Sequence, residues 1–208
     1  IITHISNWLK NYANSCNSKG FVIGISGGID SAVTSTLAAK TGLPLICIEM
    51  PIHQNKTQVD RGLKHIKWLK KKFLNVRSIK LDLTSIFDEF ITKLPINNKN
   101  ELALANTRAR LRMTTLYYFA QANNSLVVGT GNKVEDFGIG FFTKYGDGGV
   151  DISPIANLLK SEVYTLGKEL AINDDILTAL PTDGLWENNK TDEEQIGATY
   201  PELEWAMN

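Results

Sequence analysis

The sequence predicts a doubly wound α/β fold, in which helices cover both faces of a parallel sheet. Three observations favour it. Short strand-like runs alternate with longer helical patterns, which is typical of βαβ units. Those runs are nearly all apolar, as strands buried on both faces are. No linker-like stretch separates a second domain, so residues 1–208 are predicted to form a single domain.

The composition fits a compact domain that carries no bulk charge. The 208 residues include 22 Lys and Arg, 22 Asp and Glu, and 43% apolar residues. A net charge of zero gives no general attraction to nucleic acid or anionic lipid, so a polyanion must be held by a local site. The basic run at 70–72 leaves a nucleic-acid partner open, but the solvated face of an amphipathic helix explains it without one. We therefore expect no nucleic-acid partner.

The chain also lacks the patterns of a membrane or secreted protein. No apolar run reaches the roughly 18 residues that cross a bilayer, and residues 1–10 do not have the pattern of a signal peptide. Cys16 and Cys47 are too few for a disulfide scaffold, and Cys47 lies inside an apolar run. We expect a cytoplasmic protein without a membrane partner, in which both thiols are structural.

The elements follow in order along the chain. Strands are predicted at 21–25, 45–50, 76–83 and 125–129. Helices are predicted at 32–40 with a start at Asp30 and Ser31, and at 57–73, 101–123 and 158–171. Gly42 is expected to end the first of these helices in a left-handed conformation. Seven glycines lie within 129–149, which predicts a loop that approaches a ligand. Turn formers and acidic residues at 180–195 predict a mobile segment.

The motif SGGIDS at 26–31 carries the sharpest chemical signal. Adjacent glycines between a buried strand and a helix bring backbone N–H groups close to an anion, at the positive end of the helix. Ser26 and Ser31 add hydroxyl donors, and Asp30 would repel phosphate unless Mg²⁺ intervened. No Walker A motif occurs in the chain. The alternative is a plain Gly-Gly turn capped by Asp30 and Ser31, and we favour a metal-bound nucleotide.

The same motif resembles the SGGxDS pyrophosphate loop of the ATP pyrophosphatases. Three more stretches resemble the NAD synthetase family in particular: NTRARLR at 106–112, GTGNKVE at 129–135 and FFTKYGDGG at 141–149. Their order and spacing match too, and the resemblance covers nearly the whole chain. It implies an adenine nucleotide alpha hydrolase-like, Rossmann-like fold. It also implies ATP-dependent amidation of deamido-NAD to NAD through an adenylated nicotinate, with release of AMP and pyrophosphate.

The resemblance implies roles for particular residues. Asp30 and Glu135 would hold Mg²⁺, and Asp30 and Lys160 would be catalytic. The residues implied to contact ATP are Gly24, Ile25, Ser26, Gly27, Gly28, Ile29, Asp30, Ser31, Thr130, Lys160 and Thr182. Those implied to contact deamido-NAD are Asn106, Arg110, Phe141, Lys144, Asp147 and Asp151. Without the resemblance, Lys160 would be interpreted as a surface lysine and Arg110 as part of an ion pair on a helix.

The resemblance also implies a homodimer. Members of the family carry a His-Lys pair in a basic C-terminal segment, and Trp205 to Asn208 do not match it. Because 208 residues leave no room for a glutamine-hydrolysing domain, ammonia is the expected nitrogen donor. No Ser-His or Cys-His constellation is evident around His4, His53 and His65, so no covalent nucleophile is expected. Two alternatives stay open: another amide-forming ATP pyrophosphatase, and a nucleotide sensor without turnover.

Overall fold

A computed structural model of the protein describes residues 1–95, 100–182 and 191–207. The elements in these residues are, in chain order, α1 (Ile2–Ser15), β1 (Gly20–Gly24), α2 (Ile29–Lys40), β2 (Leu45–Glu49), α3 (Lys56–Lys72), β3 (Val76–Lys80), α4 (Thr84–Thr92), α5 (Glu101–Ala122), β4 (Ser125–Val127), the π-helix η1 (Lys133–Ile139), α6 (Lys160–Glu169), α7 (Asp174–Leu177), α8 (Asp192–Ile196) and α9 (Tyr200–Met207). None of these helices is both long and apolar enough to cross a membrane.

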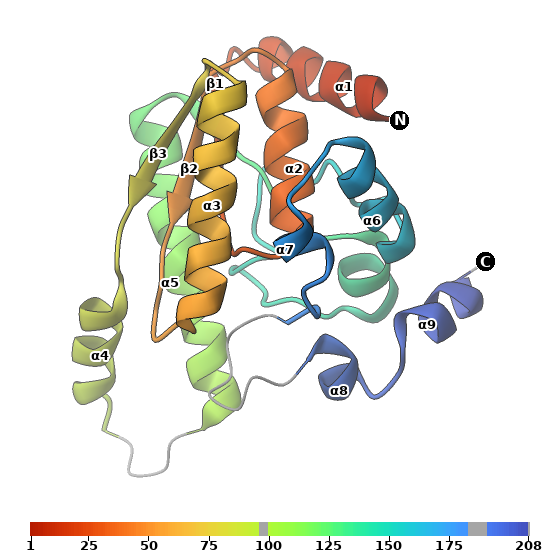
Figure 1. Cartoon of the computed structure of the whole chain (residues 1–208). Helices are drawn as coiled ribbons and strands as arrows, with labels where there is room; N and C mark the ends of the chain where they lie inside the picture. The colour runs from red at the N-terminus through yellow and green to blue at the C-terminus, as the bar shows by residue number, and fades with distance from the viewer. Residues whose placement is uncertain (96–99, 183–190, 208) are drawn as a thin grey trace.

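The described strands form one parallel sheet in the order β3-β2-β1-β4, and Figure 1 labels β1, β2 and β3. The chain moves outward from β1 to β3, and then crosses back to place β4 on the other side of β1. Crevices at such reversals of strand order are where open α/β sheets bind ligands. The reversal at β1 therefore puts the loop that follows Gly24 at the expected binding position.

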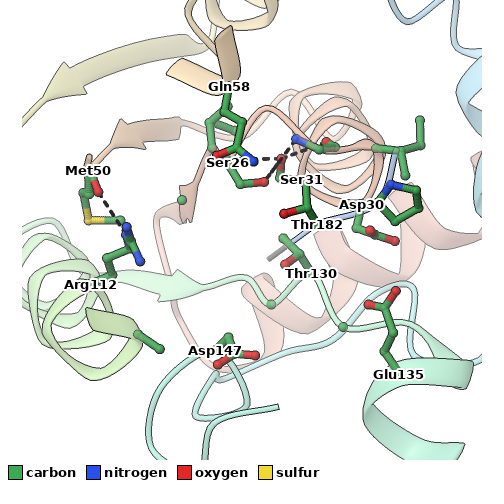
Figure 2. A pocket seen from close by; sticks show the side chains of 18 of the residues that line it. Ser26, Asp30, Ser31, Met50, Gln58, Arg112, Thr130, Glu135, Asp147 and Thr182 are labelled. Atoms are coloured by element: carbon green, nitrogen blue, oxygen red, sulfur yellow. Dashed lines mark hydrogen bonds between the residues drawn. The ribbon is translucent and has the colours of Figure 1, made fainter. Parts of the chain in front are cut away.

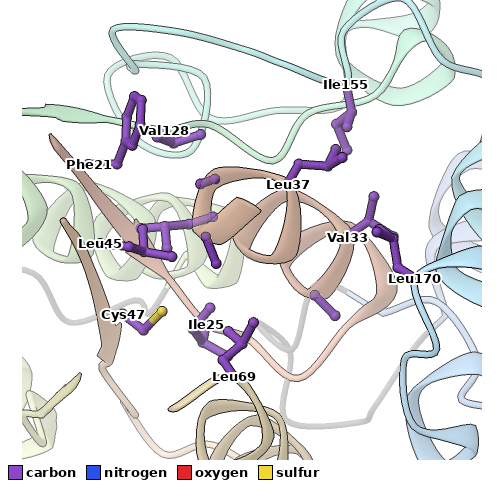
Figure 3. Packing of buried hydrophobic residues seen from close by; sticks show 14 of the residues in the cluster. Phe21, Ile25, Val33, Leu37, Leu45, Cys47, Leu69, Val128, Ile155 and Leu170 are labelled. Carbon is purple, nitrogen blue, oxygen red and sulfur yellow. The ribbon is translucent and has the colours of Figure 1, made fainter. Parts of the chain in front are cut away.

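Helices cover both faces of the sheet, as predicted. Phe21 and Ile23 of β1 belong to one apolar cluster, together with residues of α1, α2, α3 and α6. Figure 3 shows part of this cluster, including Phe21. Val22, between them, belongs to a second cluster that includes Leu116 of α5 and Phe87 of α4. Successive side chains of a strand point to opposite faces, so these buried apolar strands require a covering layer on each side.

The predicted helices are confirmed, with shifted ends. The helix predicted at 32–40 begins at Ile29, because residues 29–31 already form its first turn. Gly42 has φ +77°, which confirms the left-handed end. The lysines at 70–72 lie exposed on the last turn of α3, and Lys72 Nζ lies 4.5 Å from the ring centroid of Trp68. The solvated-face interpretation of this basic run is therefore supported.

Other expectations were wrong or incomplete. The stretch at 129–149 is not all loop, since Asn132 Oδ1 accepts hydrogen bonds from the N–H groups of Val134 and Glu135 and so begins η1. Helices α1 and α4 were not predicted. The segment predicted to be mobile includes residues 183–190, which lie outside the described residues, while its end forms α8. Cys47 is buried and Cys16 is exposed, and both are free thiols.

Candidate functional site

The glycine loop at 26–31 is tightly folded by its own hydroxyl groups. Ser31 Oγ donates to the carbonyl of Gly28 at 3.0 Å and lies 3.1 Å from Ser26 Oγ. Gly27 has φ +84°, and a Cβ on it would lie 2.4 Å from the carbonyl oxygen of Gln58. This position therefore requires glycine for its conformation and for the close approach of α3.

Helix α2 begins at Ile29, so residues 29–31 of this motif form its first turn, with the first N–H groups of the helix available to a ligand. Its N-cap is Gly28, which has no side chain that could accept hydrogen bonds from the N–H groups of the first turn. The first N–H groups of a helix have no partner inside the helix, and the helix dipole favours negative charge at this end. The loop and the start of α2 thus form the anion-binding geometry that the sequence predicted.

Lys160 joins two predicted acidic residues into one cluster. Its Nζ lies 2.7 Å from Asp30 Oδ2 and 2.7 Å from Glu135 Oε1. Asp30 comes from the first turn of α2, Glu135 from η1 and Lys160 from the start of α6. Asn132 Nδ2 donates to the other oxygen of Asp30 at 3.2 Å. The side chain of Lys160 is only 3% exposed, so Lys160 is not a surface lysine.

Burial and ion pairing have opposite effects on the pKa values of the three residues in this cluster. Burial raises the pKa of Asp30, although Lys160 opposes that rise. Burial would also raise the pKa of Glu135, but the charge and hydrogen bond of Lys160 and the hydroxyl of Tyr200 outweigh it and lower that pKa. Burial alone would lower the pKa of Lys160, and the two carboxylates reverse this and raise it. One cation for two carboxylates leaves the cluster acidic.

A cavity of about 280 Å³ opens beside this cluster. Figure 2 shows Asp30 and Glu135 at one end of it, and Arg112 and Met50 at the other. The predicted residues that line it are Gly24, Ile25, Ser26, Gly28, Ile29, Asp30, Ser31, Thr130, Glu135, Phe141, Asp147, Lys160 and Thr182. The fold thus brings residues separated by more than a hundred positions in the sequence around one cavity.

The remaining predicted residues lie around the loop after η1. Arg110 Nε donates to the carbonyl of Lys144 at 3.1 Å, and Asn106 Oδ1 accepts from Thr143 Oγ1 at 2.7 Å. These bonds tie α5 to the 141–149 loop. Asp151 accepts hydrogen bonds from the hydroxyl of Tyr117 and the N–H of Val127, so its carboxylate anchors the loop to β4 and α5. Asn106, Arg110, Lys144, Asp151 and Gly27 do not line the cavity.

Sequence reasoning missed several residues of the site. Asn132 both begins η1 and contacts Asp30, and an Asn ahead of a helical turn is a signal that could have identified it. Arg112 donates to the carbonyl of Met50 at 2.9 Å and to Gln54 Oε1 at 2.6 Å at the far end of the cavity. Asp136 also lines the cavity, where burial and then Asp147, Glu135 and Asp30 raise its pKa to about 7.

The fold brings together a serine and a histidine that the sequence pattern did not connect. Ser35 Oγ lies 2.9 Å from His65 Nε2, where α2 packs against α3. Both residues are fully buried, and neither lines the cavity. Since a substrate cannot reach this pair, it does not supply a nucleophile.

The fold and the cavity define an α/β protein with a cavity and an exposed helix N-terminus at the switch point of its sheet. The chain belongs to the NAD synthase family, whose model matches residues 1–208. It is 39% identical over 207 residues to the NH(3)-dependent NAD(+) synthetase of Carboxydothermus hydrogenoformans, covering 95% of this chain and 80% of that relative.

Two solved structures extend the comparison. The NMN synthetase from Francisella tularensis has a TM-score of 0.91 and 38% identity, over 99% of this chain and 84% of that one. The NH3-dependent NAD synthetase from Campylobacter jejuni, in complex with the nitrate ion, has a TM-score of 0.76 and 32% identity. That match covers 85% of this chain and 74% of the other.

Proposed function

We propose that this protein uses ATP to join ammonia to the nicotinate carboxylate of deamido-NAD, forming NAD, AMP and pyrophosphate. The observation that carries the proposal is the single cavity that unites the SGGIDS loop, Lys160 and the 141–149 loop. Membership of the NAD synthase family and the named NH3-dependent relatives support it.

The chemistry requires an activated carboxylate, because a free carboxylate is a poor electrophile. Attack of the nicotinate oxygen on the α-phosphorus breaks the bond to pyrophosphate and forms an acyl adenylate. The lone pair of ammonia then attacks the carbonyl carbon, and AMP leaves. The N–H groups at the start of α2 and the ammonium of Lys160 stabilise the charge that builds on pyrophosphate.

We further propose Mg²⁺ on the ATP phosphates, held by Asp30 and Glu135. The donor set fits, because carboxylate oxygens are hard ligands and Mg²⁺ is commonly bound by one or two of them together with phosphates and water. Among the described residues, no three His, Cys, Asp or Glu side chains converge to hold a metal alone. When bound, Mg²⁺ would neutralise phosphate charge beside a cluster that is itself acidic.

For the other residues, we propose that Thr130 and Thr182 contact the phosphates. Phe141 and Asp147 line the side of the cavity where the nicotinate end would lie. Arg110, Lys144, Asn106 and Asp151 would bind or support the dinucleotide outside the cavity, where Arg110 and Lys144 are exposed. We also propose that the protein is cytoplasmic and forms a homodimer. Its mass in solution tests the dimer.

We consider a second candidate substrate to accept the ammonia, because the similar Francisella structure is named an NMN synthetase. An enzyme of that kind amidates the mononucleotide, deamido-NMN. The test is to compare kcat/KM for deamido-NAD and deamido-NMN, each with ATP, Mg²⁺ and ammonium. We expect the dinucleotide to be preferred, and a preference for the mononucleotide would contradict the proposed substrate.

Separating the nucleotide products by chromatography tests the reaction type. AMP and pyrophosphate are expected in equal amounts, and they should form only when the acceptor is present. ADP and orthophosphate would contradict cleavage between the α and β phosphates. Binding of ATP without any product would favour the sensor alternative.

A further inference from the structure

Tyr200, at the start of α9, contacts the Lys160 cluster from the side of the C-terminal segment. Its hydroxyl donates a hydrogen bond to Glu135 Oε1, the same oxygen that accepts from Lys160. The ring centroid of Tyr200 lies 5.1 Å from Lys160 Nζ, within the range of a cation–π contact. Tyr200 is 7% exposed, and Glu193 Oε1 accepts its backbone N–H at 2.8 Å. The phenol is therefore held in place.

Helix α9 also docks onto the two elements that carry Glu135 and Lys160. Glu204 accepts hydrogen bonds from the N–H and the Oγ of Ser161, at 2.8 and 2.7 Å, in the first turn of α6. Met207 packs on Gly138 of η1, where an added Cβ would lie 1.8 Å from the methionine Cε. In Figure 1, α9 follows α8 at the blue end of the chain. It packs against both α6 and η1.

These contacts restrict Glu135 in a way that Lys160 alone does not. Two donors on Glu135 Oε1 fix the rotation of the carboxylate. The direction in which the second oxygen, Oε2, points is therefore fixed as well. The carboxylate oxygen can only accept, so the Tyr200 hydroxyl is the donor in this hydrogen bond. Because α9 bridges η1 and α6, it also fixes the separation of the backbones that carry Glu135 and Lys160.

We propose that α9 is a positioning element for the reaction, and that Tyr200 is its positioning residue, orienting Glu135 toward the metal-bound phosphates. The inference rests on the proposed function, because it assigns the purpose of this orientation. It adds a residue of α9 to a site whose other residues come from α2, η1, α6 and the loops of the sheet.

The test compares Tyr200→Phe with the unaltered protein. The variant keeps the ring over Lys160 and loses only the hydroxyl. Removal of a group that orients a metal ligand typically costs about 10 to 100-fold in metal affinity or activity. We expect the Mg²⁺ concentration for half-maximal turnover to rise, or kcat to fall, by at least about 10-fold. The KM for ammonium should change little. Tyr12→Phe removes a hydroxyl from an exposed tyrosine and should leave these values unchanged.

Glu204→Gln tests the docking of α9, and Glu202→Gln is its matched control. Each glutamate accepts one N–H and one hydroxyl, but Glu202 bonds Thr199, next to its own helix, whereas Glu204 bonds α6. We expect the larger rise in Mg²⁺ requirement from Glu204→Gln. Equal effects, or a Tyr200→Phe enzyme with unchanged kcat and Mg²⁺ dependence, would overturn the proposal.

Hydrogen exchange provides a readout that does not depend on turnover. Without ligands, Tyr200→Phe and Glu204→Gln should exchange faster in peptides covering 133–139 and 160–166, while the sheet keeps its protection. If the unaltered protein does not turn over deamido-NAD, the proposed function fails, and faster exchange would still support the role of α9 in fixing η1 and α6. Unchanged exchange would refute that role.

Discussion

His65 Nε2 lies 2.9 Å from Ser35 Oγ where α2 packs against α3, and the fully buried imidazole stacks on the half-buried ring of Trp68. Burial lowers the pKa of this histidine to about 4 in the folded protein. The unfolded chain has an ordinary histidine pKa of about 6.5 and binds the proton at a higher pH. Protonation in the unfolded state therefore opposes folding as the pH falls.

This pKa predicts a loss of stability in mild acid. Between pH 7 and pH 5, the free energy of unfolding should fall by about 2 kcal/mol through His65 alone. Above pH 7 the contribution should be constant, because both states are then neutral. Urea unfolding at each pH measures it. His65→Gln should remove this part of the slope, while His4→Gln, at an exposed position, should leave it unchanged.

Gly27 and Gly42 predict different outcomes for the same substitution. Both have φ values in the left-handed region, which costs an alanine roughly 1–2 kcal/mol. A Cβ on Gly27 would also meet the Gln58 carbonyl, whereas a Cβ on Gly42 meets open space. Gly27→Ala should therefore weaken ATP binding, measured by calorimetry, in addition to lowering the melting temperature. Equal ATP affinity in both variants would contradict the geometry of the loop.

The pairing of Lys160 with two carboxylates predicts which substitution in the cluster destabilises the protein more. Lys160→Met leaves Asp30 and Glu135 buried without their cation, and breaking a buried pair costs about 3–5 kcal/mol. Asp30→Asn leaves Lys160 paired with Glu135 and should destabilise less. Both variants should lose most turnover. Denaturant unfolding measures the order, and a Lys160→Met protein as stable as Asp30→Asn would show that the carboxylates do not need their cation.

The nitrogen donor predicts a characteristic pH dependence. Only neutral ammonia has the lone pair that attacks the acyl adenylate, and amines of this kind titrate at about 10. The apparent KM for total ammonium should therefore fall about tenfold per pH unit from pH 7 to pH 8. Glutamine should not replace ammonium at either pH. A flat profile would indicate that ammonium itself binds and loses its proton in the site.

Much of the fold was predictable because its signals are local. Apolar runs such as 45–50 identified buried strands, and Gly42 marked a helix end that the backbone confirms. The π-helix was missed because glycines favour loops, while the capping side chain of Asn132 reaches only the next three residues. Helix α1 was also missed, although it is amphipathic and the helical spacing of its buried Ile5, Leu9 and Ala13 is a local signal.

The site was predictable only in part. The six residues of the SGGIDS loop are enough to predict a phosphate-binding site. The roles of Lys160 and Glu135 were predicted only from the family resemblance. Nothing local to Tyr200 indicates that it contacts Glu135, 65 positions earlier. The pairing of Lys160 with two carboxylates is likewise a product of the tertiary fold, so it could not be read from any one segment.

Asp30 and Lys160 are separated by 130 positions along the chain, although their side chains touch. At a synthesis rate of about 5–20 residues per second, a ribosome needs roughly 7 to 26 s to make the intervening polypeptide. During that time β1, β2 and β3 can pair, while the Asp30 carboxylate has no counterion from Lys160. Translation therefore supplies the strands of the sheet before the lysine of the cluster, and a translation product interrupted before residue 160 would carry the glycine loop without Lys160.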